Sequence, residues 1–187
     1  MMNKLVSLVV VSALGSIAFS ADGAKPFSVS IGLGNYANKT AKNFTRASGL
    51  AFGLGYKMAT KPMIAPGRET SGIDLTYFDT SKNGNRNTNW GLTFGPQVFL
   101  DKSMTTYGTF GVGVYSSRLT TAPAAGNARP SRAPAAGTSE TVTRFGAKLG
   151  LGYQTMQGIF IEANYHILGK RQGIDLNHTT IMVGFKF

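Results

Sequence analysis

Apolar side chains recur at every second position in eight segments of the chain. The segments cover residues 27–34, 50–58, 73–77, 90–100, 109–114, 144–153, 159–167 and 181–187. In the last segment Ile181, Val183, Phe185 and Phe187 alternate with small or charged residues. Because successive side chains of a strand point to opposite faces, this period predicts eight strands, each with one apolar and one small polar face.

This pattern favours an all-β protein, an eight-stranded antiparallel up-and-down transmembrane β-barrel with a polar lumen. A soluble calycin-like barrel also alternates, with its apolar face inward. Here the polar face is mostly Gly, Ser and Thr, which fit the crowded interior of eight strands. The even strand count allows closure, and a closed sheet leaves no unpaired backbone in lipid. Aromatic residues of the apolar face also gather near the segment ends, as two interfacial girdles; these are Tyr77, Trp90 and Tyr165 for the outer girdle and Phe27, Tyr56, Tyr153, Phe185 and Phe187 for the inner one.

Two segments fit the pattern less well. Pro96 has no N–H for the ladder and therefore indicates a bulge or a gap in pairing. Tyr107 and Tyr115 fall on the small face of the fifth strand, so that they either cap the two ends of the lumen or mark a slip in register.

The N-terminus predicts export. Lys4 precedes an apolar stretch at 5–17, and Ala18-Phe19-Ser20 offers small residues for cleavage before Ala21. This stretch is too short for a transmembrane helix and is typical of a signal peptide. We therefore assign 1–20 to a cleavable signal peptide and 21–187 to one barrel domain. The chain has no cysteine, which excludes disulfides, thiolate catalysis and lipoprotein anchoring.

The connections predict which end of the barrel faces outward. Those at 101–103 and 154–158 are short, as periplasmic turns are, whereas 35–48, 79–89, 116–140 and 168–176 are longer and polar, as external loops are. The connection at 59–70 is long for a periplasmic turn, and 121–137 is rich in Pro and Ala. The net charge is +11. The predicted external loops hold only three acids, Asp79, Glu140 and Asp175, and ten bases: Lys39, Lys42, Arg46, Lys82, Arg86, Arg118, Arg129, Arg132, Lys170 and Arg171.

The end of the chain resembles the small outer-membrane β-barrel superfamily, which includes opacity-type, OmpA transmembrane-domain, OmpX-like and OmpW-like proteins. The resemblance lies in Gly158-Ile159-Phe160-Ile161-Glu162-Ala163-Asn164-Tyr165, Gly173-Ile174-Asp175-Leu176-Asn177 and Val183-Gly184-Phe185-Lys186-Phe187. It implies the outer membrane of a Gram-negative-type bacterium as the location. It also implies that the terminal aromatic residues, Phe185 and Phe187, are read by the barrel-assembly machinery. Members of this superfamily include anchors, adhesins, narrow channels and lipid-A enzymes, so the resemblance does not give the activity.

The inward face carries a set of charged and polar residues, which we expect to fill the lumen: Asp74, Arg144, Lys148, Glu162, His166 and Lys186. Charges in a narrow barrel need partners, and we expect Glu162 to pair with Arg144 or Lys148 on the neighbouring strand. Lys57 lies near a strand end. The alternative is a narrow ion path lined by the same residues.

Candidate catalytic and metal-binding patterns are weak. An eight-stranded lipid-A deacylase carries Ser two residues from its His, whereas Leu168 stands in that place after His166. The two histidines have no metal-ligand spacing, and the Gly-x-Gly pairs lie within predicted strands rather than in phosphate-binding turns. We therefore expect no enzyme, cofactor or metal.

The prediction is a non-enzymatic outer-membrane barrel that presents basic external loops for lipopolysaccharide, other surface polyanions or host molecules, as an envelope component or adhesin. The alternatives are an OmpW-like channel for small ions or apolar solutes and, third, a lipid-A-modifying enzyme. The exported location and the lack of interleaved aromatic and basic residues argue against nucleic acid as a partner.

Overall fold

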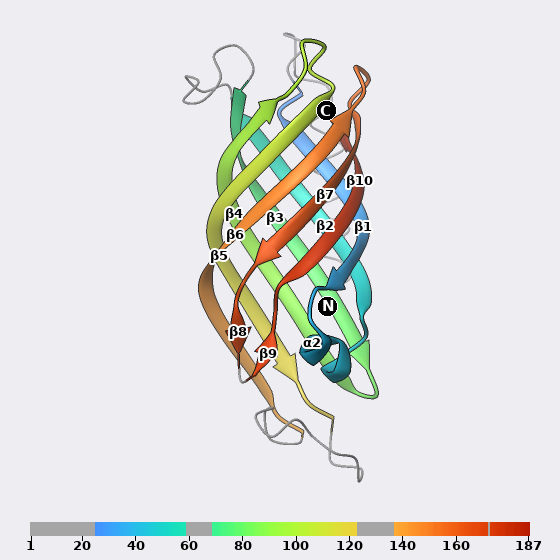
Figure 1. The fold of residues 1–187 in the computed structure, drawn as a ribbon, viewed down its shortest axis with the longest axis vertical. Helices are drawn as coiled ribbons and strands as arrows, with labels where there is room; N and C mark the ends of the chain where they lie inside the picture. The colour runs from blue at the N-terminus through green and yellow to red at the C-terminus, as the bar shows by residue number, and fades with distance from the viewer. Residues whose placement is uncertain (1–24, 59–68, 123–136, 172) are drawn as a thin grey trace.

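Eight strands form a closed antiparallel barrel in the part of the chain that the structure describes. The computed structural model describes residues 25–58, 69–122, 137–171 and 173–187. Its elements are β1 (Phe27–Tyr36), α2 (Lys39–Phe44), β2 (Ser48–Met58), β3 (Glu69–Lys82), β4 (Asn85–Phe99), β5 (Thr106–Thr120), β6 (Ser139–Gln154), β7 (Ile159–Ile167), β8 (Lys170–Arg171), β9 (Ile174–Asp175) and β10 (His178–Lys186). Around the barrel the order is β1, β10, β7, β6, β5, β4, β3, β2, so the first and last strands meet (Figure 1). The predicted fold is confirmed, and the predicted signal peptide at 1–20 lies outside the described residues.

The apolar face of the barrel points outward and the small polar face points inward. Leu33, Leu151 and Ile181 are more than half exposed, whereas the lumen-facing Thr93 and Asn164 are almost fully buried. This is the reverse of a soluble barrel, and it places the aliphatic side chains where lipid would cover them. Within the described residues, no helix is long and apolar enough to cross a membrane.

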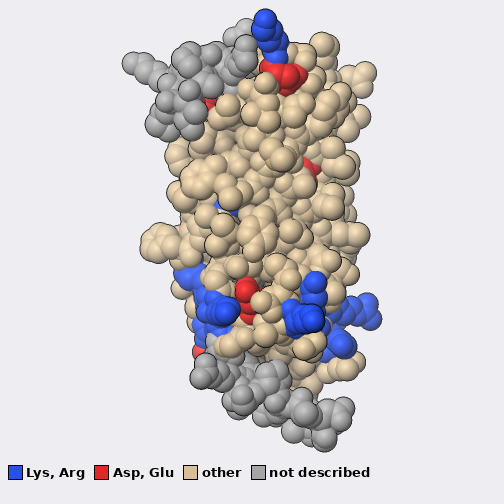
Figure 2. Space-filling model, viewed as in Figure 1, with Lys and Arg blue, Asp and Glu red and all other residues tan. Residues whose placement is uncertain are grey.

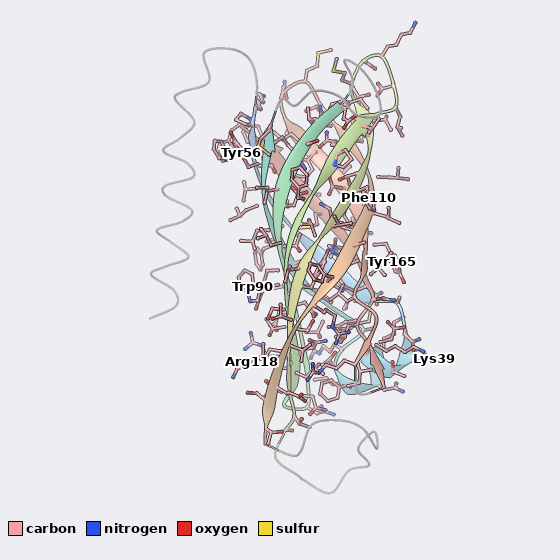
Figure 3. All side chains as sticks on the ribbon, turned by 90° about the vertical axis from the view of Figure 1, so that its left-hand side faces the viewer. Lys39, Tyr56, Trp90, Phe110, Arg118 and Tyr165 are labelled. Carbon is pink, nitrogen blue, oxygen red and sulfur yellow. The ribbon has the colours of Figure 1, made fainter. Side chains whose placement is uncertain are left out.

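Aromatic side chains lie at two levels on the outer face. Near the described chain ends, the ring of Phe27 lies 4.9 Å from that of Tyr56 and 6.1 Å from that of Phe187, between ring centroids. At the other level Tyr77 and Trp90 lie 4.5 Å apart. Figure 3 shows Tyr56 near one end, with Trp90 and Tyr165 farther along the barrel. We call the end that holds Lys25 and Phe187 the terminal end, and the opposite end the loop end.

Two strand pairs continue past the predicted loop boundaries at the loop end. β3 and β4 run on to Lys82 and Asn85, and only Asn83 and Gly84 connect them, with φ of 51° and 78°. This is the Asn-Gly hairpin turn that favours positive φ at both central residues. The predicted loop at 79–89 was therefore wrong. Likewise β5 extends to Thr120 and β6 begins at Ser139, which shortens the predicted loop at 116–140.

The irregular positions in β4 and β5 have a simple explanation. Phe94 pairs with Val112 and Gln97 pairs with Thr109, in one continuous register, while Gly95 and Pro96 make no pair with β5. Pro96 thus causes a gap in pairing rather than a bulge. The register of β5 against β6 is also constant, and both Tyr107 and Tyr115 are buried in the lumen without any slip.

The turn between β4 and β5 is held by one carboxylate. Asp101 accepts hydrogen bonds from the side chain of Ser103 and from the backbone N–H groups of Thr105 and Thr106, at 3.0 and 2.7 Å for the two N–H groups. The bonds from Ser103 and Thr106 hold the pKa of the Asp101 carboxyl well below its usual value. The short turn that was predicted at 101–103 is therefore present, and the hydrogen bonds to the Asp101 carboxylate stabilise it.

We expect Asp101→Asn to lower the thermal unfolding midpoint at pH 7. Because the pKa of Asp101 is lower in the folded state than in the unfolded state, its stabilisation is present above the unfolded pKa of about 3.9 and is lost as the pH falls through the folded pKa. The difference between wild type and Asp101→Asn should therefore shrink as the pH falls below about 4. Melting curves at neutral and acid pH measure this difference, and a gap that stays constant with pH would rule out the proposed role of the charge.

Candidate functional site: a filled lumen and a basic rim

The middle of the lumen contains a network of buried charges. Asp74 on β3 lies 2.8 Å from the Nζ of Lys148 on β6 and 3.1 Å from the Nζ of Lys57 on β2. Lys148 also lies 3.8 Å from Glu162 on β7. Small residues around these side chains leave room for them, since a Cβ at Gly55 would lie 2.8 Å from the Asp74 carboxylate. Each charge has an opposite partner, which buried ions require.

Glu162 completes this network with neutral partners. The hydroxyl of Tyr107 donates to its Oε2 at 2.9 Å, and the Nδ2 of Asn164 donates to its Oε1 at 2.8 Å. Of the two bases expected beside Glu162, the structure brings Lys148 and not Arg144. The inward positions of β6 run from Lys148 through Gly146 to Arg144 toward the loop end, so Arg144 lies too far along the barrel to meet Glu162. The Nη1 of Arg144 instead donates to the backbone oxygens of Leu168 and Lys170 at 2.9 and 3.2 Å.

Lys186 lies apart from both carboxylates, at the terminal end of the lumen. Its ammonium donates to the side-chain oxygen of Gln154 and lies above the rings of Tyr107 and Phe160, at 4.8 and 5.5 Å from the centroids. The sequence places Lys186 on the inward face correctly, but the structure gives it no carboxylate within ion-pair distance among the described residues.

A stack of aromatic rings lies above the charged network, toward the loop end. His166 and His178 stack at 4.5 Å between centroids, and Phe78 stacks on the other side of His178 at 4.6 Å. The ring nitrogens of His166 lie 3.1 Å from the Tyr115 hydroxyl and 3.2 Å from the Thr180 hydroxyl. His166 is thus a hydrogen-bonded lumen residue. The contact with His178 was not predicted, although both histidines belong to neighbouring strands at paired positions.

An apolar cap closes the loop end of the barrel. It consists of α2 together with the segment that follows β7, and its buried side chains, which share one apolar cluster with Leu119 of β5, are Ala41, Phe44, Leu168, Ile174 and Leu176. The helix begins at Asn38, whose side chain accepts from the N–H of Thr40 at 3.0 Å. The N–H of Asp175 in turn donates to the Thr40 hydroxyl at 3.0 Å, which ties α2 to β9. Sequence reasoning placed both segments in polar loops and missed this cap.

The residues weighed for a catalytic or a metal site lie in the lumen and in the cap. Leu168, at the position where a deacylase would need its nucleophile, is buried in the cap, and the partners of His166 are hydroxyl groups rather than a carboxylate. The described residues contain no group of three or more His, Cys, Asp or Glu side chains able to hold a metal ion. The cavity around Asp74, Lys148 and Glu162 has a volume of about 30 Å³.

That small volume predicts a closed pore. A cavity of this size holds on the order of one water molecule, and the stacked rings of His166, His178 and Phe78 fill the lumen between it and the loop end. We expect the purified wild-type protein to give no stable conductance steps in planar lipid bilayers. Discrete steps of reproducible size would contradict this expectation and would favour the channel alternative.

Basic side chains surround the loop end of the barrel. Eight of the ten predicted bases are described, and most of them are exposed: Lys39, Lys42, Arg46, Lys82, Arg86, Arg118, Lys170 and Arg171. Figure 2 shows Lys and Arg gathered in this part of the molecule, while the middle of the same face is largely uncharged. Arg129 and Arg132 lie outside the described residues. Several of the eight lie on strands or on α2 rather than on the loops where they were expected.

Two of these eight bases have carboxylate partners. Arg86 forms a two-point pair with Asp79, with N–O distances of 2.8 and 2.9 Å, and Arg171 pairs with Glu140. The other six have no carboxylate within ion-pair distance in the described part of the chain. We call Lys39, Lys42, Arg46, Lys82, Arg118 and Lys170 the unpaired rim bases.

Comparisons with known proteins agree with the barrel architecture. A family model described as "Outer membrane protein beta-barrel domain" matches residues 6–187. Among solved structures, the outer membrane protein Ail of Yersinia pestis in a phospholipid bilayer nanodisc is 14% identical, with a TM-score of 0.50 over 88% of this chain and 100% of that chain. Ail in complex with the heparin analogue sucrose octasulfate is 16% identical, with a TM-score of 0.46 over 88% of this chain and 100% of that chain. The outer membrane enzyme PagL is 14% identical, with a TM-score of 0.43 over 86% and 98%. No curated protein matches. At these identities the likeness shows the fold alone.

Proposed function

Since the chain belongs to the family of outer membrane protein beta-barrel domains, we propose that it is a non-enzymatic surface protein of the outer membrane. Its basic rim binds phosphate or sulfate groups of the cell surface, first of all those of lipopolysaccharide, and its filled barrel is a rigid envelope component that presents this rim. The observation that supports the proposal is the set of six unpaired rim bases.

The unpaired rim bases have no charge partner within the described protein. An exposed ammonium or guanidinium group without a carboxylate is free to contact an anion, and clustered bases raise the local concentration of anions around them. Each base near an anionic lipid surface contributes about 1 kcal/mol to binding. Several such bases at one end of a barrel therefore favour a polyanionic surface over a small neutral ligand.

Arg118 lies at the height where lipid phosphates are expected. On the adjacent strand β4, Arg118 pairs with Thr88, which lies two residues from Trp90 in the direction of the loop end. The Trp90 ring is half exposed on the outer face. Tryptophan at such a position marks the boundary between hydrocarbon and head groups. Arg118 also points outward, and one of its Nη atoms donates to the Ser139 hydroxyl at 3.1 Å. Figure 3 shows Arg118 farther toward the loop end than Trp90. We expect the remaining donors of Arg118 to meet head-group phosphates at this level.

A catalytic function has less support from the same geometry. The polar side chains that come together do so inside the lumen, where Lys148, Asn164 and His166 are almost fully buried. A nucleophile, its base and an orienting acid must meet at a place that substrate reaches. His166 instead lies between Tyr115 and Thr180, beneath the apolar cap.

The proposal is tested by binding of lipid A to the refolded mature protein in a nonionic detergent. The probes are lipid A with both phosphates and the same lipid without phosphates. We expect binding that requires the phosphates and that weakens as salt screens the charges. A variant with Lys39, Lys82, Arg118 and Lys170 changed to Ser should bind roughly several hundredfold more weakly, since each of the four bases contributes about 1 kcal/mol and about 1.4 kcal/mol is a factor of ten.

A matched pair of single variants separates rim contact from overall charge. Arg118→Ser and Lys102→Ser each remove one exposed positive charge, at the loop end and at the terminal end respectively. Only Arg118→Ser should weaken the binding of phosphorylated lipid A. Equal affinity of the wild type and the four-base variant would refute the proposed role of the rim. Binding of dextran sulfate, with dextran as the uncharged control, would extend the role to soluble polyanions.

A further inference from the structure

Three lysines, two on strands and one in the segment before β1, line one cavity at the terminal end. The cavity has a volume of about 360 Å³ and opens beside the turns at 103–105 and 154–158. Lys25 lies two residues before the start of β1, Lys57 lies on β2 and Lys186 on β10, and β1 is the neighbour of both β2 and β10 in the barrel. The three side chains therefore converge from one wall, and none of them belongs to the basic rim.

Lys186 lacks the partner that a buried ammonium requires. The residue is only 9% exposed, and its Nζ donates to the neutral oxygen of Gln154 and otherwise faces aromatic rings. An ammonium has three donors, and burying it without a matching anion costs free energy. An anion in the adjacent cavity would supply the missing partner.

The nearby carboxylates do not balance the positive charge. Among the described residues that line this cavity and the lumen above it, four lysines meet only Asp74 and Glu162. Asp74 is shared between Lys57 and Lys148, and Glu162 accepts hydrogen bonds from Tyr107 and Asn164. Both acids are thus already engaged, and the cavity has an excess of positive charge.

The rest of the cavity wall suits an anion with an organic part. The amide group of Gln97 and the hydroxyl groups of Thr70 and Thr155 lie among the lining residues, together with apolar side chains such as Met156. Converging lysines bind phosphate as point charges, without the planar geometry that favours arginine for carboxylates. From this arrangement we infer that the terminal end of the barrel holds a binding site for a phosphate group, with Lys25, Lys57 and Lys186 as its cationic side.

Lys25 places this site next to the membrane surface. Its Nζ lies 5.5 Å from the centroid of Phe185, and Phe185 points outward near the inner aromatic girdle. Its side chain thus bridges the cavity and the lipid-facing wall. The phosphate therefore has two sources, the head group of a phospholipid in the periplasmic leaflet or a phosphate compound in solution.

The test is calorimetric titration of the refolded mature protein in octyl glucoside. The probes are inorganic phosphate and monomeric dihexanoyl phosphatidylglycerol. We expect the wild type to bind at least one of them, and Lys186→Met and Lys25→Met each to weaken that binding about tenfold, which is the effect of one charge-assisted hydrogen bond. Lys25→Met lies outside the strands and should leave the barrel intact even if Lys186→Met does not fold.

Lys102→Met is the matched control, because Lys102 is exposed at the same end but does not line the cavity. This control should bind as the wild type does. Binding of the lipid alone identifies a head group as the source, binding of inorganic phosphate alone identifies a soluble compound, and binding of both identifies the phosphate group itself. No binding of either probe, or equal affinity in all four proteins, would overturn the inference whatever happens at the basic rim.

Discussion

Asp74→Asn should destabilise the barrel by about 3–5 kcal/mol, the effect of breaking a buried ion pair from one side. The Asp74 carboxylate is the shared partner of Lys57 and Lys148, and Lys148 is only 3% exposed. Removing the charge leaves Lys57 without a carboxylate and Lys148 with only the longer contact to Glu162, at 3.8 Å, in a lumen with little water. Urea unfolding in lipid vesicles, followed by the fluorescence of the single Trp90, measures the loss of stability.

Asp79→Asn is the control for this change. Asp79 also pairs with a base, Arg86, but on the outer surface, where such a pair contributes about 0–1 kcal/mol. The double variant Asp74→Asn with Lys148→Met should recover part of the loss, because it removes one of the two ammonium groups that have lost Asp74 as a partner. If Asp74→Asn costs no more than Asp79→Asn, the lumen is far more hydrated than its geometry indicates.

The alternation of side chains predicted the strands well within the membrane and poorly beyond it. The seventh strand begins and ends where it was expected, at Ile159–Ile167. In β3 and β4, however, outward positions beyond Tyr77 and Trp90 become polar, so that the apolar period ends while the hydrogen-bonded ladder continues to Lys82 and Asn85. The period therefore reports the thickness of the apolar layer and not the length of the strands.

The alternation of side chains identifies which residues point into the lumen, but it does not identify which of these residues form pairs. Asp74, Lys148 and Glu162 all fall on inward positions that the sequence identifies. Which of Arg144 and Lys148 meets Glu162 depends on the stagger between β6 and β7, where Gly152 is the residue opposite Glu162. That stagger is fixed by closure of the whole barrel. Lys57, which the sequence placed only near a strand end, turned out to be a direct partner of Asp74 for the same reason.

The apolar cap left only a weak signal in the sequence. Asn38 followed by Ala41 and Phe44, with apolar residues three apart, is the pattern of a capped helical turn. Six residues are too few to form a helix without tertiary contacts. The helix therefore depends on Ile174 and Leu176, which lie more than a hundred residues away in the chain.

Gly32→Ala should prevent most of the protein from reaching the closed barrel. A Cβ at Gly32 would lie 1.9 Å from the backbone oxygen of Ile181, at the seam where β1 pairs with β10. Overpacking costs about 1–3 kcal/mol where side chains can move, and we expect at least the upper value here because the obstacle is backbone. Gel migration in SDS of unheated and heated samples measures the folded fraction, since a closed barrel shifts on heating.

Gly108→Ala makes the same chemical change where there is space for it. Nothing lies within 4 Å of a Cβ at Gly108, which is on the outer face of β5. Because Gly in a strand interior is less stable than Ala by about 0.5–1 kcal/mol, this variant should fold as well as the wild type or better. A normal heat shift for Gly32→Ala would mean that β1 and β10 adjust their separation at the seam, and that closure tolerates side chains where the two strands now touch.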